Sequence, residues 1–262
     1  MKDRIISYSG DEYGLREQHN QTLLFLEMLD AHCLKYSIKY SLAYGTMLGC
    51  VRSHGFIPWD DDVDIVMMRP DYNRFMESIK LRDTELSRKC SIYCPQYINK
   101  LKYEANNGKQ SFSIYTDLFA ADIVPRNIIV KWSKYIAMLV LKTTLVGRTG
   151  KKNSLFRLTR KVLAYLISFP FSIEWLRHLF SKMALWGSNN PSEKFGCYYA
   201  SHLSYGIYHD KEVFKSVKYV SFEDIELPVM EGYDKYLTKE FGDYMTPPPQ
   251  KDRHATHTEG WN

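Results

Sequence analysis

Residues 59–68 read WDDDVDIVMM, four acidic residues leading into an apolar run. In a β-strand, successive side chains point to opposite faces of the sheet. A strand here would place Asp62 and Asp64 on one face and turn Val63 and Ile65 into a core. Two carboxylates about 6–7 Å apart on one face can bind a single Mg²⁺, a hard ion that prefers oxygen ligands. The stretch therefore predicts a strand of an α/β protein with a metal site at its start.

Two other structures would explain the same acidic residues: a solvated acidic loop, or a loop that binds Ca²⁺. Both are disfavoured because no Gly or Asn lies among the acidic residues and the apolar run follows at once. Mg²⁺ bound there would hold the phosphates of a nucleotide and offset their charge during phosphoryl transfer, with Mn²⁺ as an alternative ion.

A Gly-Thr pair, Gly45-Thr46, lies upstream between a strand expected over residues 38–44 and a helix expected over 47–53. Backbone N–H groups at a helix start, with a Thr hydroxyl beside them, suit a phosphate. The pair is a weak signal alone and a more specific one when followed by Asp-x-Asp. Arg52 follows Gly45 by seven residues and so lies on roughly the same helix face, where it would contact either a phosphate or a nearby aspartate.

Further elements follow from hydrophobic periodicity, proline and glycine positions along the rest of the chain. Apolar residues recur at helical spacing near the N-terminus, and a Pro-Pro-Pro run ends helix formation near the C-terminus. We expect helices over residues 15–36, 71–79 and 231–241, a strand over 113–119, and apolar helical runs over 128–146 and 155–185.

Composition excludes several classes of protein. Of the 262 residues, 45% are hydrophobic and 25% are charged, which is not the composition of a disordered chain. The five cysteines include no CxxC pair, which indicates a reducing compartment, and Cys90 and Cys94 lack the second ligand pair of a zinc site. No signal-peptide pattern and no uncharged apolar stretch of about 18–20 residues is present, so we expect a soluble cytoplasmic protein.

Charge is distributed unevenly. The formal net charge is +5, but residues 128–188 contain eleven Lys and Arg against one acidic residue, Glu174. Basic amphipathic helices of this kind lie on anionic membrane surfaces. The alternative is a pair of core helices whose lysines reach water. A nucleic-acid partner is disfavoured because the cations are interleaved with long aliphatic runs instead of a stacking platform.

The stretch that joins these motifs, residues 44–65, reads YGTMLGCVRSHGFIPWDDDVDI and closely resembles the signature of the LicD family. This family contains bacterial phosphocholine transferases and is similar to fukutin-related enzymes. Two further stretches resemble it: Asp117-Leu118-Phe119 with Asp122 and Pro125, and residues 228–257. The resemblance covers about residues 15–125 and 219–257, and residues 126–218 fit it poorly.

The resemblance implies an α/β (α+β) nucleotidyltransferase-like core, with a mixed sheet flanked by helices and a basic helical insertion. The corresponding domains are 1–127, 128–218 and 219–262, the first and last forming the core. It implies transfer of phosphocholine or a related phospho-alcohol from a CDP-linked donor to a glycan or lipid-linked oligosaccharide, at the inner face of the membrane. It also assigns Asp62 and Asp64 to the metal and places Asp60 at the entry to the site.

A third carboxylate would complete the metal site or accept the proton of the acceptor hydroxyl. Asp117 is the preferred residue because it is expected to end a strand and matches the second family motif, and Asp122 is the alternative. Either residue would instead be a helix N-cap if a helix followed the strand.

Four more residues are candidates for substrate contacts. Arg253 suits a phosphate because guanidinium binds its oxygens in a bidentate way, and His257 would orient or protonate a phosphate oxygen. A frayed terminal tail is the alternative for both. Tyr244 and Trp59 would stack on a base or on a cationic choline head, unless they are simply buried.

Two other functions remain open from the sequence. A nucleotidylyltransferase would use the same metal site and release pyrophosphate instead of CMP. A non-catalytic module would use the basic segment to bind a membrane or a partner protein.

Overall fold

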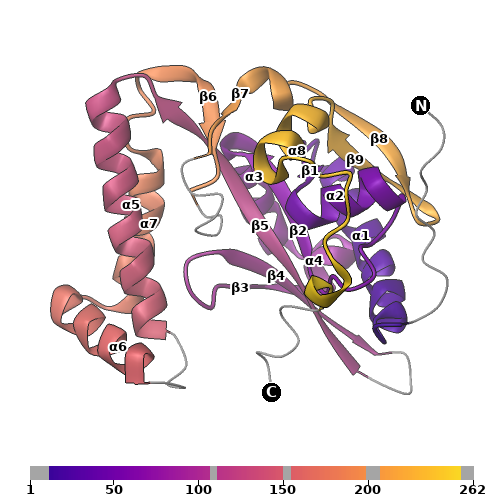
Figure 1. Cartoon of the computed structure of the whole chain (residues 1–262), viewed down its shortest axis with the longest axis horizontal. Coiled ribbons are helices and arrows are strands. Elements are labelled where there is room, and N and C mark those ends of the chain that lie inside the picture. Colours follow the sequence, from indigo (N-terminus) through magenta and orange to yellow (C-terminus); the bar gives the residue numbers. More distant parts are fainter. Residues whose placement is uncertain (1–11, 107–110, 150–154, 199–206, 255–262) are drawn as a thin grey trace. The chain divides into compact units, whose positions relative to one another are not determined.

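The structure, a computed structural model, describes residues 12–106, 111–149, 155–198 and 207–254 (Figure 1). These residues form two compact units. Unit 1 holds the described residues up to Tyr93, Lys100–Ala120 and those from Glu212 onward, and unit 2 holds Cys94–Asn99 and Ala121–Lys211. Helices and strands occur in both units, so the predicted mixed α/β class is confirmed.

Unit 1 contains most of the sheet and the helices that flank it. In chain order its elements are α1 (Arg16–Lys35), β1 (Ser41–Leu42), α2 (Tyr44–Ser53), β2 (Val63–Met68), α3 (Arg69–Ser78), the 3₁₀ helix η1 (Ile79–Leu81), α4 (Glu85–Lys89), β3 (Cys90–Tyr93), β4 (Asn99–Asn106), the first part of β5 (Ser111–Pro125), η2 (Lys211–Phe214), β8 (Val217–Phe222), β9 (Ile225–Met230), α8 (Tyr233–Phe241) and η3 (Gln250–Asp252).

The strands of this sheet lie in the order β1-β2-β5-β4-β3, which makes β2 and β5 neighbours. β1 pairs antiparallel with β2, and β3 pairs antiparallel with β4. Side chains of α1 and of the strands form a core that is fully shielded from water, including Leu26, Leu42, Ile65 and Leu101. Each such aliphatic side chain stabilises the fold by about 1.5–3 kcal/mol.

A two-stranded hairpin, β8–β9, attaches to this sheet and supports the loop before β2. The Met230 N–H at the end of β9 donates to Ser41 Oγ in β1 over 2.9 Å. At the hairpin turn, the Glu223 carboxylate accepts from the Phe56 N–H over 3.1 Å. A Cβ atom on Gly55 would meet that carboxylate at 2.0 Å, so a larger residue there would require the Glu223 side chain to move. The hairpin therefore holds in place the part of the chain that leads into the acidic run.

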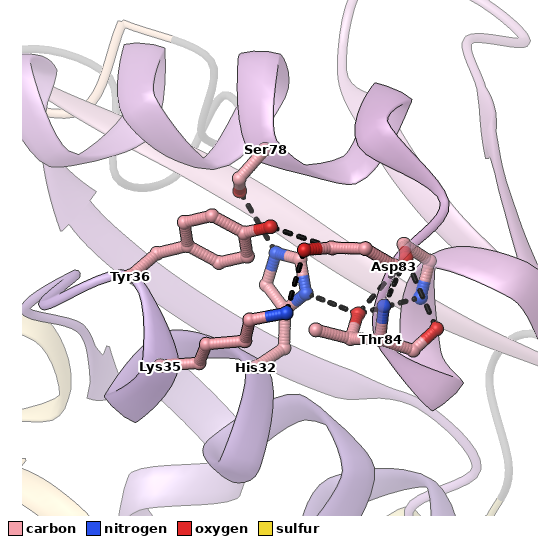
Figure 2. A network of polar contacts seen from close by, with 7 residues as sticks. His32, Lys35, Tyr36, Ser78, Asp83 and Thr84 are labelled. Carbon is pink, nitrogen blue, oxygen red and sulfur yellow. Dashed lines mark hydrogen bonds and ion pairs between the residues drawn. The ribbon is translucent and has the colours of Figure 1, made fainter.

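A polar network joins α1 to the segment between α3 and α4 (Figure 2). His32 is fully buried, and its two ring nitrogens contact Ser78 Oγ at 2.8 Å and Thr84 Oγ1 at 2.6 Å. Outside it, the exposed Asp83 carboxylate accepts from Lys35 and Tyr36, each over 2.5 Å. The buried contacts fix the position of α1, whereas exposed ion pairs of this kind contribute little stability.

Unit 2 contains the predicted apolar helices. Its elements are the last part of β5, α5 (Ile128–Thr149), α6 (Leu155–Ser168), α7 (Ile173–Leu185), β6 (Pro191–Gly196) and β7 (His209–Asp210). Asn127 begins α5 by accepting from the N–H groups of Ile129 and Val130, and both α6 and α7 pack against α5. β6 pairs antiparallel with both β5 and β7.

The predicted helices near residues 15–36, 71–79 and 231–241 are confirmed to within a few residues. The run predicted over 155–185 is instead two helices, separated at Pro170, because proline cannot continue a helix. Strands β3, β4, β6, β7, β8 and β9 were not predicted. In the described part of the chain, no helix combines the length and the apolar character needed to cross a membrane.

The buried histidine makes stability depend on pH. Burial lowers the pKa of His32, so the ring is neutral in the fold, whereas an unfolded His titrates near 6.5. Its contribution to stability is therefore present above pH about 6.5 and is lost as the pH falls below that value. We expect His32→Leu to lower the free energy of unfolding by about 1–3 kcal/mol at neutral pH, through two lost hydrogen bonds, and this loss to shrink with acidification.

Chemical denaturation of wild type and variant across this pH range measures the effect. The control is Lys35→Ala, which removes an exposed ion pair and should cost less than about 1 kcal/mol. A His32→Leu penalty that is equal at acidic and neutral pH would contradict a lowered pKa.

Candidate metal and active site

Three carboxylates converge in unit 1: Asp62, Asp64 and Asp117. One oxygen of each lies within 4.8 Å of the corresponding oxygens of the other two. Asp62 directly precedes β2, Asp64 lies in β2, and Asp117 lies in the neighbouring strand β5. Val63 and Ile65 are buried, as the alternation along β2 requires. Neighbouring strands thus bring together residues that are more than fifty positions apart.

Like charges make this cluster unfavourable for an ionised carboxylate. Burial raises the pKa of Asp64 well above its usual range, and the negative charges of Asp62, Asp117 and Asp60 raise it further. A cation within reach of all three oxygens would offset both effects. Carboxylate oxygens are the ligands that Mg²⁺, Mn²⁺ and Ca²⁺ take, so the donor set fits a hard divalent ion.

A lysine that the sequence did not indicate belongs to the same cluster. Lys100 Nζ in β4 lies 2.5 Å from Asp117 Oδ1, and both side chains are nearly buried. Burial disfavours the charged ammonium, but the carboxylates, Asp117 first, raise the pKa of Lys100 overall. Lys100 was missed because β4 was not predicted, and no local pattern marks a lysine as the partner of a distant aspartate.

The first turn of α2 contacts the start of the acidic strand. The Asp64 N–H donates to Thr46 Oγ1 over 2.9 Å, so the Thr hydroxyl fixes the strand relative to the helix. A Cβ on Gly45 would meet Asp60 Oδ2 at 2.7 Å, which shows how closely the Asp60 carboxylate approaches the helix. The Asp60 carbonyl is in turn held by His19 Nε2 over 2.7 Å. Gly45, Thr46 and Asp60 therefore lie together beside Asp64.

The structure links four of the predicted substrate contacts, Arg52, Tyr244, Arg253 and Trp59, into two pairs. Arg52 is buried, and its Nη1 donates to the Tyr244 carbonyl over 3.4 Å. The Arg253 guanidinium lies over the Trp59 ring, 5.2 Å from its centroid, while its Nε donates to the Pro248 carbonyl. Trp59 is only 9% exposed, so much of its surface is already packed.

The Tyr244 hydroxyl, Asp122 and His257 are not part of these two pairs. The Tyr244 hydroxyl donates to Asp234 over 2.6 Å. Asp122 is buried in the part of β5 that belongs to unit 2, where it pairs with Gly196. His257 lies outside the described residues.

The reason given for Asp117 was wrong in one respect. Asp117 and Asp122 both lie inside β5, which continues to Pro125, so neither ends a strand and neither is a helix N-cap. The strand is longer than expected because its last residues pair with β6, which the sequence did not reveal. Asp117 nonetheless belongs to the carboxylate cluster. Its place in the site rests on its distance to Asp62 and Asp64 and not on its position along the strand.

Part of this chain is similar to a known protein family. Residues 37–143 match the family model described as LicD/FKTN/FKRP, nucleotidyltransferase domain. The chain is 29% identical over 263 aligned positions to "Lipopolysaccharide cholinephosphotransferase LicD" of Haemophilus influenzae, covering 94% of this chain and 96% of that protein. Uncharacterised proteins of Rickettsia typhi and Rickettsia prowazekii are 46% and 50% identical over 56 and 50 residues, covering 18% and 19% of those proteins.

The buried carboxylate yields a prediction on stability and ion binding. Asp64→Asn keeps the side-chain shape but removes a charge that its neighbours repel, so we expect the metal-free protein to melt a few degrees higher, about 2–4 °C per kcal/mol gained. An ion that binds only the folded state raises the wild-type melting temperature, and the variant should lose most of this rise. Scanning fluorimetry with EDTA and with Mg²⁺ or Mn²⁺ measures both quantities.

The exposed carboxylate Asp83, mutated to Asn, is the matched control and should keep the ion-dependent rise. An equal rise for wild type and Asp64→Asn would rule out Asp64 as a ligand.

The ion pair in the cluster yields a second prediction. Lys100→Met leaves the nearly buried Asp117 without its cation, so we expect the metal-free protein to lose about 2–4 kcal/mol of stability. A divalent ion replaces the lost positive charge, so its stabilising effect should be larger than in wild type. Lys102→Met, on the same strand with a more exposed ion pair to Glu104, should cost less than about 1 kcal/mol. Equal losses for the two lysines, by denaturation in EDTA, would contradict a special role for Lys100.

Proposed function

We propose that this protein transfers phosphocholine or a related phospho-alcohol from a CDP-linked donor to a sugar hydroxyl of a cell-surface glycan. The match of residues 37–143 to the model of the LicD/FKTN/FKRP nucleotidyltransferase domain supports this proposal. The observation that carries the proposal is the cluster of Asp62, Asp64 and Asp117, which lies wholly within the matched domain. The Haemophilus relative supports it, since its name describes a cholinephosphotransferase that acts on lipopolysaccharide and the alignment spans nearly all of both chains.

We propose Mg²⁺ as the ion held by the cluster, with Mn²⁺ as a substitute. Asp62 and Asp64 would be ligands, and Asp117 a third ligand or the base. When bound, the ion would offset the negative charge of the donor's diphosphate, which three carboxylates would otherwise repel. The backbone N–H groups at the start of α2, which include that of Gly45, suit the same diphosphate.

The transfer is a substitution at the β-phosphorus of the donor. The acceptor hydroxyl oxygen forms a bond to that phosphorus, the bond to the bridging oxygen breaks, and CMP leaves. The hydroxyl proton goes to a carboxylate. Asp117 Oδ1 is held by Lys100, so a proton accepted by Asp117 would go to Oδ2.

Arg253 and Arg52 are the proposed cationic contacts of the donor, with Trp59 and Tyr244 beside them. The contacts between Arg253 and Trp59, and between Arg52 and the Tyr244 carbonyl, support their acting together. The proposed place of the reaction is the cytoplasm, at the inner face of the cell membrane, where a lipid-anchored acceptor would be reached.

The products distinguish this function from nucleotidylyl transfer. We expect CMP, and no pyrophosphate, when the protein is incubated with Mg²⁺, a glycan acceptor and one of a panel of donors: CDP-choline, CDP-ethanolamine, CDP-glycerol and CDP-ribitol. Phosphorus NMR identifies both the leaving group and the new phosphodiester. Asp62→Asn and Asp64→Asn should each lower turnover by about two orders of magnitude or more, because each removes a charged ligand.

Asp83→Asn is again the matched control and should turn over at the wild-type rate. Pyrophosphate released from CTP, with no CMP from any CDP-linked donor, would establish nucleotidylyl transfer instead. Retained turnover in Asp62→Asn or Asp64→Asn would remove those residues from the site.

A further inference from the structure

The exposed side of α5 in unit 2 is apolar. Its well-exposed residues are, with the exception of Thr143, all large and apolar: Ile128, Ile129, Trp132, Ile136, Leu139 and Val140. Between 41% and 72% of each of these six is accessible to solvent. At 3.6 residues per turn they fall within one arc of about 120° on the helix. Single exposed apolar residues are common on proteins, but a continuous apolar arc marks an interaction surface.

The buried side of the same helix contains lysines. Lys134 is fully buried, with its Nζ 4.1 Å from the centroid of the Tyr198 ring, and Lys142 is 7% exposed, with its Nζ 5.1 Å from that of Tyr97. Burial lowers the pKa of Lys142 to about 8. A surface helix of a protein in water normally shows the opposite arrangement, with its charges outward. The inward side of α5 therefore holds two lysines beside the buried apolar residues Met138 and Leu145, while its outward side is apolar.

Helix α6 repeats the apolar exposure next to α5. Val162, Leu163 and Leu166 of α6, and Phe169 directly after it, are exposed by 52–78%, and the buried positions include Ala164 and Ser168. The two helices are joined at Arg148, whose guanidinium lies 4.5 Å from the centroid of the Tyr165 ring. Figure 1 shows α6 at one end of α5. Both helices belong to unit 2 and pack against each other.

Helix α7 is the internal comparison within unit 2. Its exposed residues include Glu174, His178, Ser181 and Lys182 together with Trp175 and Leu185, which is the mixture expected for a helix that faces water. The apolar exposure is thus a property of α5 and α6 and not of every helix in the unit.

Charge identifies what would cover this surface. Residues 128–168, which include α5 and α6, contain nine Lys and Arg and no acidic residue. Lys134 and Lys142 are buried, which leaves seven cations in this part of the sequence to act on a partner. Two copies of such a surface would repel each other, whereas an anionic lipid surface would attract it. Aromatic side chains with one polar edge, such as those of Trp132 and Tyr165, are also typical of the boundary between lipid and water.

We propose that the exposed faces of α5 and α6 form a docking surface for an anionic phospholipid bilayer, into which their apolar side chains insert while neighbouring cations contact the lipid head groups. The helices lie in the plane of the interface, and only the outward side chains leave water. This surface uses none of the residues assigned to phospho-alcohol transfer. It deepens the proposed function in one respect, because a glycan anchored to lipid would be found at the same membrane.

The experiment uses the full-length protein and vesicles, without donor or acceptor, so its result is independent of the transfer reaction. We expect co-sedimentation with vesicles of phosphatidylcholine and phosphatidylglycerol in equal parts, and at least about tenfold weaker binding to phosphatidylcholine alone. Binding should weaken between about 0.05 M and 0.5 M salt, because the electrostatic part is screened. The triple variant Ile129→Gln, Ile136→Gln, Val140→Gln should lose at least about tenfold in partitioning, since three exposed apolar side chains no longer enter lipid.

The matched control replaces three equally exposed apolar residues of unit 1: Leu24→Gln, Leu34→Gln, Leu81→Gln. It should bind vesicles as wild type does. Circular dichroism and melting temperature establish that both triple variants remain folded. Absence of binding to the anionic vesicles at low salt would overturn the proposal, as would equal losses in the two triple variants. A wild-type dimer in sedimentation equilibrium that becomes monomeric in the α5 variant, with no vesicle binding, would assign the surface to a second copy of the chain.

Discussion

The main physical constraint on unit 1 is the repulsion between three neighbouring carboxylates. Asp62, Asp64 and Asp117 are brought within 4.8 Å by two adjacent strands, and burial makes the charge on Asp64 still less favourable. Lys100 offsets part of this charge from a third strand, β4. An arrangement that costs stability in the absence of a cation is retained where binding requires it, so the cluster is better explained by ligand binding than by folding.

The surrounding contacts hold the strand that carries these charges. Thr46 fixes the backbone of Asp64 to the first turn of α2, and the hairpin turn at Glu223 fixes the loop that leads into the acidic run. A glycine lies against a carboxylate at both points, Gly45 against Asp60 and Gly55 against Glu223, and a side chain there would displace that carboxylate. Each contact restricts a backbone movement that would let the carboxylates separate. The site is therefore preorganised by backbone contacts.

The sequence predicted those features that depend on local pattern. Alternation in residues 59–68 gave the strand and the common direction of Asp62 and Asp64, and the Gly-Thr pair gave the helix start beside them. Long-range pairing was not visible in the same way. Lys100 reaches Asp117 only because β4 lies next to β5, and neither β4 nor the hairpin β8–β9 has a pattern that stands out in the chain. The helix break at Pro170 was a local signal that the apolar run on either side of it obscured.

A buried charge needs a compensating partner, and the two units provide different partners. In unit 1 a cluster of two half-buried carboxylates and one buried carboxylate is partly offset by Lys100, and a divalent ion is the proposed further partner. In unit 2 buried lysines lie over tyrosine rings, whose negative faces attract cations without adding a formal charge. The inward positions of α5 hold Lys134 and Lys142 beside the apolar Met138 and Leu145, and six large apolar residues lie on its outward side. Buried charge and exposed apolar surface thus lie on opposite sides of one helix, an arrangement that water disfavours and that the proposed contact with lipid would favour.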